Sequence, residues 1–245
     1  FFHQNDKTSM AAKTGSVSYE TLMGKIEARE FSPIYILMGE ESYYIDKLCD
    51  ALMNSILPED EREFNQFVMF GSDVTADQVA DYARELPMMS QYKVIVVKEA
   101  QNIKQLEALE RYLDHYSPQT ILVYCHKNGS IDRRKKFVTR AQAVGVVFES
   151  AKIKESALPA FVESYLKTRH VAIEPKTALV IAESIGQDLS RLASELDKLC
   201  LAMTGDKRKV TAELVEECIG VSKDYNSYDS TKIELISPDI DSYSF

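Results

Sequence analysis

The sequence predicts an α/β domain with a parallel sheet, followed by a small bundle of helices. Two observations lead to this prediction. Short apolar runs alternate with helical patterns up to about residue 150, and from Lys154 onward the pattern is helical throughout. Short, nearly continuous apolar strands between helices are typical of a parallel sheet covered on both faces. A chain of 245 residues also suits two domains of roughly 100–200 residues each.

The elements of the first half follow from local patterns. Tyr19–Ala28 is predicted to be a short amphipathic helix, and later helical stretches are expected at about 42–56, 75–86, 100–115 and 132–143. Thr75 followed by Gln78 three residues on is the pattern of a capping box. The predicted strands are the apolar runs Ile34–Met38, Phe67–Phe70, Val94–Val97, Ile121–Cys125 and Val146–Phe148.

The second half carries the signals of three or four helices. Pro175 suits a first helical turn and Gly186 a helix end. A longer helix ends at Gly205 and a last short one at Gly220. Their apolar faces are Leu189, Leu192, Ala193, Leu196, Leu199, Cys200 and Met203, then Leu214, Val215, Cys218 and Ile219. The expected divisions are a disordered lead-in over 1–17, the α/β domain over 18–150, the helical domain over 151–222 and a tail over 223–245.

Composition narrows the class of protein. No apolar run approaches the roughly 18 residues that a membrane span needs, so no membrane partner is expected. A net charge of −9 favours a protein partner over DNA as sole partner. The histidines show no ligand spacing, and we predict neither a metal site nor a cofactor. Four scattered cysteines indicate reduced thiols and a cytoplasmic location: Cys49, Cys125, Cys200 and Cys218.

The ends of the predicted strands, where parallel sheets bind ligands, lack nucleotide chemistry. Gly39 is not followed by the second glycine, lysine and Ser/Thr of a P-loop. Instead Glu40 and Glu41 would repel a phosphate at a helix N-terminus. Lys98 and then Glu99 follow the third strand, where an ATPase needs an acid directly after the apolar run to hold magnesium. We predict a degenerate nucleotide site without catalysis. An acid/base pair of the two adjacent glutamates is the less favoured alternative, because neighbouring helix residues do not face each other.

An unusual apolar cluster, Leu86, Pro87, Met88 and Met89, lies in a connection from a helix to a strand. Loops normally run over the surface and are polar. The residues leave two interpretations open. The methionines pack back into the core, or they form an exposed prong that binds a partner, since methionine adapts to irregular grooves.

A basic run, Arg133, Arg134, Lys135 and Lys136, also has two interpretations. It contacts DNA phosphates, or it is the solvated start of a helix whose next residues, Phe137 and Val138, point inward. The second interpretation is favoured.

Taken in order and at their separations, nine segments resemble the delta-subunit family of the bacterial DNA polymerase III clamp loader. The resemblance runs from about Phe31 to Tyr225. The segments are Pro33–Glu41, Phe64–Asn65, Gly71–Asp73, Leu86–Ser90, Val94–Ala100, Asp132–Lys136, Ile185–Leu189, Glu195–Leu199 and Ile219–Tyr225.

This resemblance implies a RecA-like AAA+ domain followed by a helical lid, and a subunit that does not hydrolyse ATP. It implies that the chain binds and opens the sliding clamp (the beta subunit) during DNA replication, beside other clamp-loader subunits and, indirectly, primer-template DNA. The clamp-contacting pair of the family falls in the loop of Leu86, Pro87, Met88 and Met89. Residues 223–245 are then a truncated tail or the start of a missing collar domain. The alternatives are an unorthodox nucleotide-binding AAA+ ATPase and an architectural loader subunit that contacts only DNA and neighbours.

Overall fold

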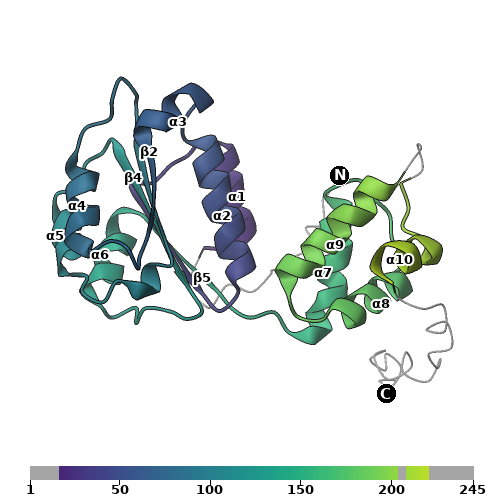
Figure 1. Cartoon of the computed structure of the whole chain (residues 1–245). Coiled ribbons are helices and arrows are strands. Elements are labelled where there is room, and N and C mark those ends of the chain that lie inside the picture. Colours follow the sequence, from purple (N-terminus) through teal and green to yellow (C-terminus); the bar gives the residue numbers. More distant parts are fainter. Residues whose placement is uncertain (1–16, 204–207, 221–245) are drawn as a thin grey trace, which may run out of the picture. The chain divides into compact units, whose positions relative to one another are not determined.

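Figure 1 presents the chain as a computed structural model that describes residues 17–203 and 208–220. The chain divides into two units between Ile153 and Lys154. The predicted lead-in, except for residue 17, and the predicted tail over 223–245 lie outside the described residues.

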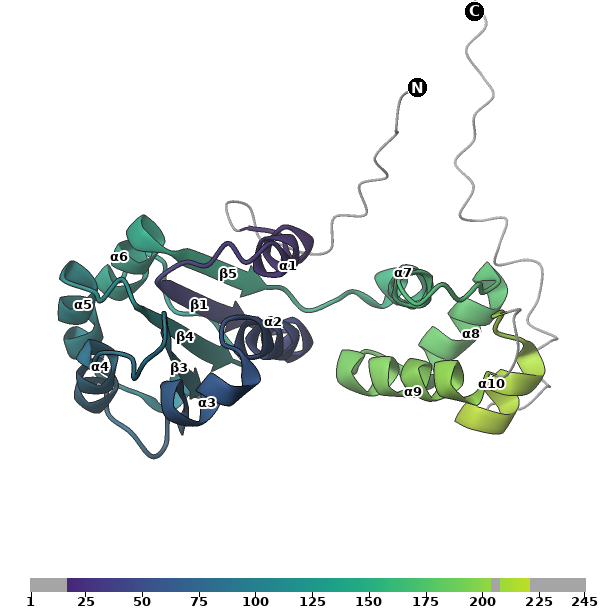
Figure 2. The same cartoon turned by 90° about the horizontal axis from the view of Figure 1, so that it is seen from above.

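The first unit is a five-stranded parallel sheet in the order β2-β3-β4-β1-β5. Helices α4, α5 and α6 cover one face of the sheet and α1 and α2 cover the other (Figures 1 and 2). The elements are α1 (Tyr19–Glu27), β1 (Ile34–Gly39), α2 (Ser42–Ser55), α3 (Glu59–Asn65), β2 (Gln66–Phe70), α4 (Ala76–Arg84), β3 (Lys93–Lys98), the 3₁₀ turn η1 (Ala100–Asn102), α5 (Glu107–Asp114), β4 (Thr120–Lys127), α6 (Lys136–Val144) and β5 (Val146–Ser150).

The central strands form the core of this unit. Every residue of β1 is buried, and its neighbours β3 and β4 are buried along most of their length. Ile36 and Leu122 from the sheet pack with Leu109 of α5 and Phe137 of α6 in one apolar cluster. Because helices cover both faces of the sheet, the sequences of these strands are continuous apolar runs rather than alternating patterns.

The edge strand β2 departs from the prediction that both faces of the sheet are covered. Val68 is 42% exposed and Phe70 is 44% exposed. Their alternate neighbours on the strand point to the other face, where the Phe67 ring lies 6.1 Å from that of Tyr82 on α4. The apolar run therefore predicted a strand correctly, and the partial exposure follows from its place at the edge.

Three helix predictions need correction. The helix α3 was not predicted, because its seven residues have no apolar face and only Asn65 is buried. The stretch at 100–115 is interrupted: after η1 the chain is extended at Ile103, and α5 begins at Glu107. The stretch at 132–143 becomes helical only from Lys136. The capping box is confirmed, with Thr75 and Gln78 each bonding to the other's backbone.

The second unit contains η2 (Glu155–Ala157), α7 (Leu158–Lys167), α8 (Pro175–Ile185), α9 (Leu189–Ala202) and α10 (Ala212–Ile219). Pro175 opens α8, and Gly186 ends it with φ 80°. Gly220 ends α10 in the left-handed conformation that glycine favours. The predicted apolar face of α9 is buried from Leu189 to Cys200. Its predicted end at Gly205 lies outside the described residues, and the helix ends at Ala202.

Two of the cysteines that are scattered in the sequence meet in the fold. Cys49 lies on α2 and Cys125 on β4, both buried and reduced. A hydrogen bond from the Cys125 thiol lowers the pKa of Cys49, and the same contact, with burial, raises the pKa of Cys125. Sequence spacing therefore missed a thiol pair that strand and helix packing creates.

Two features are absent from residues 17–203 and 208–220. No helix in these ranges has the length and apolar character to cross a membrane. Within the same ranges, no three His, Cys, Asp or Glu side chains are grouped so that they could hold a metal ion.

Candidate functional site

The turn after β1 lies at the carboxyl end of the sheet, and its first two backbone amides are already engaged. The Gly39 N–H donates to the Gly129 carbonyl oxygen at 2.8 Å, and the Glu40 N–H donates to the Ser150 carbonyl oxygen at 3.2 Å. A phosphate-binding turn presents such N–H groups to its ligand. Here these two donors face neighbouring backbone instead.

Glu41 places a carboxylate at the N-terminus of α2. It is the N-cap residue, 8% exposed, and its side chain accepts a hydrogen bond from the Tyr43 N–H at 3.2 Å. Its carbonyl oxygen accepts a bond from the Ser150 hydroxyl at 2.9 Å. Negative charge is stabilised at a helix N-terminus, so Glu41 takes the position that an anionic ligand needs. This geometry fits the interpretation of a helix-start carboxylate.

Lysines are the last residues of strands β3 and β4. Lys98 is the last residue of β3, and the exposed Glu99 follows it with a left-handed φ of 51°. Lys127, the last residue of β4, forms an ion pair with Asp46 of α2 at 2.6 Å. Burial lowers the pKa of His126, just before it, below the ordinary value of 6.5. Cations do not coordinate magnesium, which agrees with the degenerate nucleotide site that we predict.

The loop between α4 and β3 exposes its apolar side chains. Met89 is fully exposed at 103%, Leu86 is 71% exposed and Met88 is 64% exposed, while Pro87 is half-buried. Of the two interpretations that the sequence left open, the structure therefore excludes the packing of both methionines in the core.

The exposed loop has a defined backbone conformation. Met89 has φ 52°, which is uncommon for a residue with a long side chain and costs roughly 1–2 kcal/mol. On either side of it, Asn65 of α3 bonds to the backbone of Met88, and Glu61 of α3 accepts a bond from the Ser90 hydroxyl. Sequence reasoning missed both α3 residues, since neither lies in an apolar pattern. The only signal was the Phe64–Asn65 segment within the family resemblance.

One residue of the basic run bonds to a buried carboxylate, and the other three are exposed to solvent. Arg133 donates to Glu149 of β5, a carboxylate that is 4% exposed, at 3.0 Å. Arg134 bonds to the exposed Asp132, and this bond lowers the pKa of Asp132 to about 2. Lys135 and Lys136 are exposed. The expected inward packing of Phe137 and Val138 is confirmed, since both are fully buried.

We expect Arg133→Ala to destabilise the first unit by about 1–3 kcal/mol, because it removes a charged partner of the buried Glu149. Arg134→Ala is the matched control and should leave stability unchanged, since its partner is exposed. Thermal and urea denaturation of the two variants measures the difference. Equal free energies of unfolding of the two variants would mean that Arg133 does not stabilise the fold.

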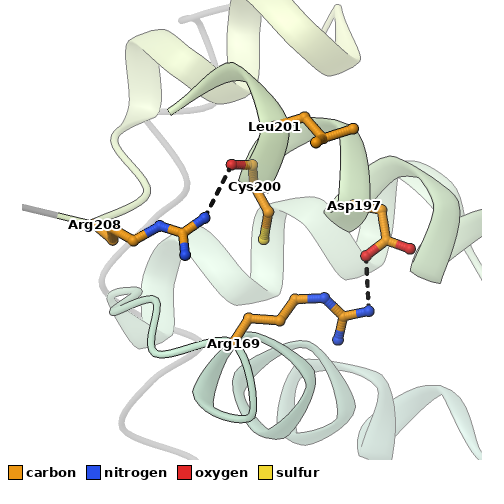
Figure 3. Close-up of a pocket in the computed structure, with 5 residues that line it drawn as sticks. All are labelled: Arg169, Asp197, Cys200, Leu201 and Arg208. Carbon is orange, nitrogen blue, oxygen red and sulfur yellow. Dashed lines mark hydrogen bonds and ion pairs between the residues drawn. The ribbon is translucent and has the colours of Figure 1, made fainter. Parts of the chain in front are cut away.

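A shallow pocket in the second unit was not predicted from the sequence (Figure 3). Arg169 lies over the Tyr165 ring at 3.8 Å and pairs with Asp197 of α9 at 2.8 Å. Arg208 donates to the Cys200 carbonyl oxygen at 3.3 Å. Both guanidinium groups thus serve the packing of the helices around them.

Comparisons with known proteins agree with this fold. Residues 35–151 match the model of the family described as DNA polymerase III, delta subunit. A curated relative, DNA polymerase III subunit delta of Bacillus subtilis (strain 168), is 22% identical over 210 residues, which are 82% of this chain and 60% of the relative. The solved Bacillus subtilis DNA clamp loader delta protein has a TM-score of 0.68 and 21% identity, covering 85% of this chain and 64% of its own.

These matches confirm the resemblance inferred from the sequence. They also confirm the predicted α/β fold class, a parallel-sheet domain followed by a small helical domain. The chain spans 60% of the length of the curated relative.

Proposed function

We propose, from its likeness to the delta subunits of DNA polymerase III, that this chain is a non-catalytic clamp-loader subunit that binds and opens the DNA sliding clamp during replication. The observation that carries the proposal is the loop of Leu86, Pro87, Met88 and Met89. It exposes three large apolar side chains on a domain in which the N–H groups of Gly39 and Glu40, after the first strand, bond to neighbouring backbone.

The loop supplies the binding energy in this proposal. A methionine side chain that moves from water into an apolar pocket contributes roughly 1.5–3 kcal/mol. The anchors of a transient interface are typically a few such residues. The direct test is a titration of the sliding clamp from the same organism with this chain, in which we expect a saturable complex.

Opening of the ring requires more than binding. A ligand shifts a conformational equilibrium only by the difference between its affinities for the two states. The loop must therefore contact the clamp more favourably when one clamp interface is open. A clamp variant locked closed by an engineered disulfide should bind this chain more weakly than the unmodified clamp.

We expect no binding of ATP with magnesium in titration calorimetry, because the turn amides of Gly39 and Glu40 are occupied and Glu41 holds negative charge at the helix N-terminus. The clamp titration on the same preparation is the positive control. A saturable heat with ATP would instead favour the unorthodox ATPase.

The proposal includes two further partners. Other clamp-loader subunits are implied by the role itself. Association with primer-template DNA is indirect, through the loader; any direct contact with its phosphates would use the exposed Lys135 and Lys136. If neutralising these two lysines abolished DNA binding while clamp affinity was absent in all variants, the architectural alternative would be favoured.

A further inference from the structure

The buried side chain of Asn65 joins α3 to the exposed loop. Asn65 is the last residue of α3 and is 1% exposed. Its Oδ1 accepts a hydrogen bond from the Met88 N–H at 2.7 Å, and its Nδ2 donates to the Met88 carbonyl oxygen at 3.1 Å. Nδ2 also donates to the Glu61 carbonyl oxygen at 3.2 Å. One amide group thus bonds both backbone polar groups of Met88 and ties them to α3.

The same helix holds the loop at a second point. The Ser90 hydroxyl donates to the Glu61 carboxylate and accepts a bond from the Tyr92 N–H at 3.3 Å. These two anchors lie on either side of Met89, the residue with φ 52°. A strained conformation persists only when its surroundings determine it. The two anchors supply that constraint where the loop is most exposed.

The base of the loop is fixed as well. Lys93, whose side chain is 3% exposed, forms an ion pair with Glu85 at 2.5 Å. Its ammonium group lies 4.8 Å from the centre of the Phe67 ring and 5.8 Å from that of Tyr82. With both ends held, the conformation of the segment between them depends on the contacts of Asn65 with Met88 and of Glu61 with Ser90.

We propose that Asn65 is a positioning residue that holds the loop in its binding conformation before the clamp arrives. This role rests on the proposed function. An apolar loop in water gains by folding back onto its own domain, and a mobile loop loses conformational entropy when it binds. Asn65 prevents the loop from folding back and lowers the conformational entropy that is lost on binding. A planar amide is required, because it offers an acceptor and donors together.

The test compares Asn65→Ala with Asn54→Ala, a control on α2 whose side-chain oxygen is 3.5 Å from Arg62. Clamp affinity, the unfolding temperature and amide hydrogen exchange at Met88 are measured on the full chain. We expect Asn65→Ala to weaken clamp binding about tenfold through the lost hydrogen bonds. It should also accelerate exchange at Met88 about tenfold or more. The control should change neither quantity.

The results separate this role from the proposed function. If the unmodified chain binds the clamp and Asn65→Ala binds equally well, the positioning role is overturned and the function stands. If the unmodified chain does not bind, the function fails and the role fails with it. Should Asn65→Ala not fold, exchange in the unmodified chain decides: a Met88 amide that exchanges as fast as in an unstructured peptide overturns the role.

Discussion

Replacing Met88 and Met89 together with alanine should weaken binding of the sliding clamp by about 10²–10⁴-fold and leave the fold intact. Each thioether side chain that enters an apolar pocket contributes roughly 1.5–3 kcal/mol, and 1.4 kcal/mol corresponds to a factor of ten in affinity. Both side chains are mostly or fully exposed in the isolated chain, so their removal leaves no cavity in the domain. Titration of the clamp measures the affinity, and circular dichroism checks the fold.

The matched control is Leu201→Ala. Leu201 is a large apolar side chain that is 84% exposed on α9 of the second unit, and the family resemblance gives it no clamp contact. We expect this variant to bind the clamp as the unmodified chain does. Equal losses in both variants would mean that general surface hydrophobicity, rather than the loop, drives association.

Gly39→Ala should lower the stability of the first unit by about 2–6 kcal/mol. A Cβ atom on Gly39 would lie 2.1 Å from the carbonyl oxygen of Ser150 and 2.3 Å from its hydroxyl oxygen, an overlap that costs typically 1–3 kcal/mol. The backbone at Gly39 has φ +136°, which adds about 1–3 kcal/mol for any residue with a side chain. The unfolding temperature should fall by roughly 4–24 °C.

Gly24→Ala provides the control for this substitution. Nothing lies within 4 Å of the position that its Cβ would take, and alanine is favoured over glycine inside a helix by roughly 0.5–1 kcal/mol. The variant should be as stable as the unmodified chain or slightly more stable. If Gly39→Ala were as stable as the unmodified chain, the end of β5 would be able to move away from the turn. The turn would then have room for a phosphate.

The sequence was most informative where both sides of an element are buried. The runs at Ile34–Met38 and Val94–Val97 predicted the central strands, because a strand inside a parallel sheet tolerates little besides apolar residues. The helix α3 could not be predicted in this way. Its first turn is acidic, and its single buried side chain, Asn65, is polar, so no apolar period marks it.

The sequence predicted which residues form the candidate site, but it did not predict how they are arranged. Pattern alone left the fate of Met88 and Met89 open, since an apolar pair fits a core as well as a binding surface. The loop that carries the pair is bonded to Glu61 and Asn65, which lie more than twenty residues earlier in the chain. The contact of Cys49 with Cys125 has the same origin, because tertiary packing brings distant residues together.

The central claim is that the exposed methionines enter a pocket of the sliding clamp. The most direct test follows the methyl resonances of isotope-labelled methionine in the full chain while the clamp is added. The chain has eight methionines, and the buried Met38 and the half-buried Met53 and Met69 serve as internal references. We predict that the Met88 and Met89 signals shift or broaden first and most. A complex in which these two signals stay unchanged would contradict the account.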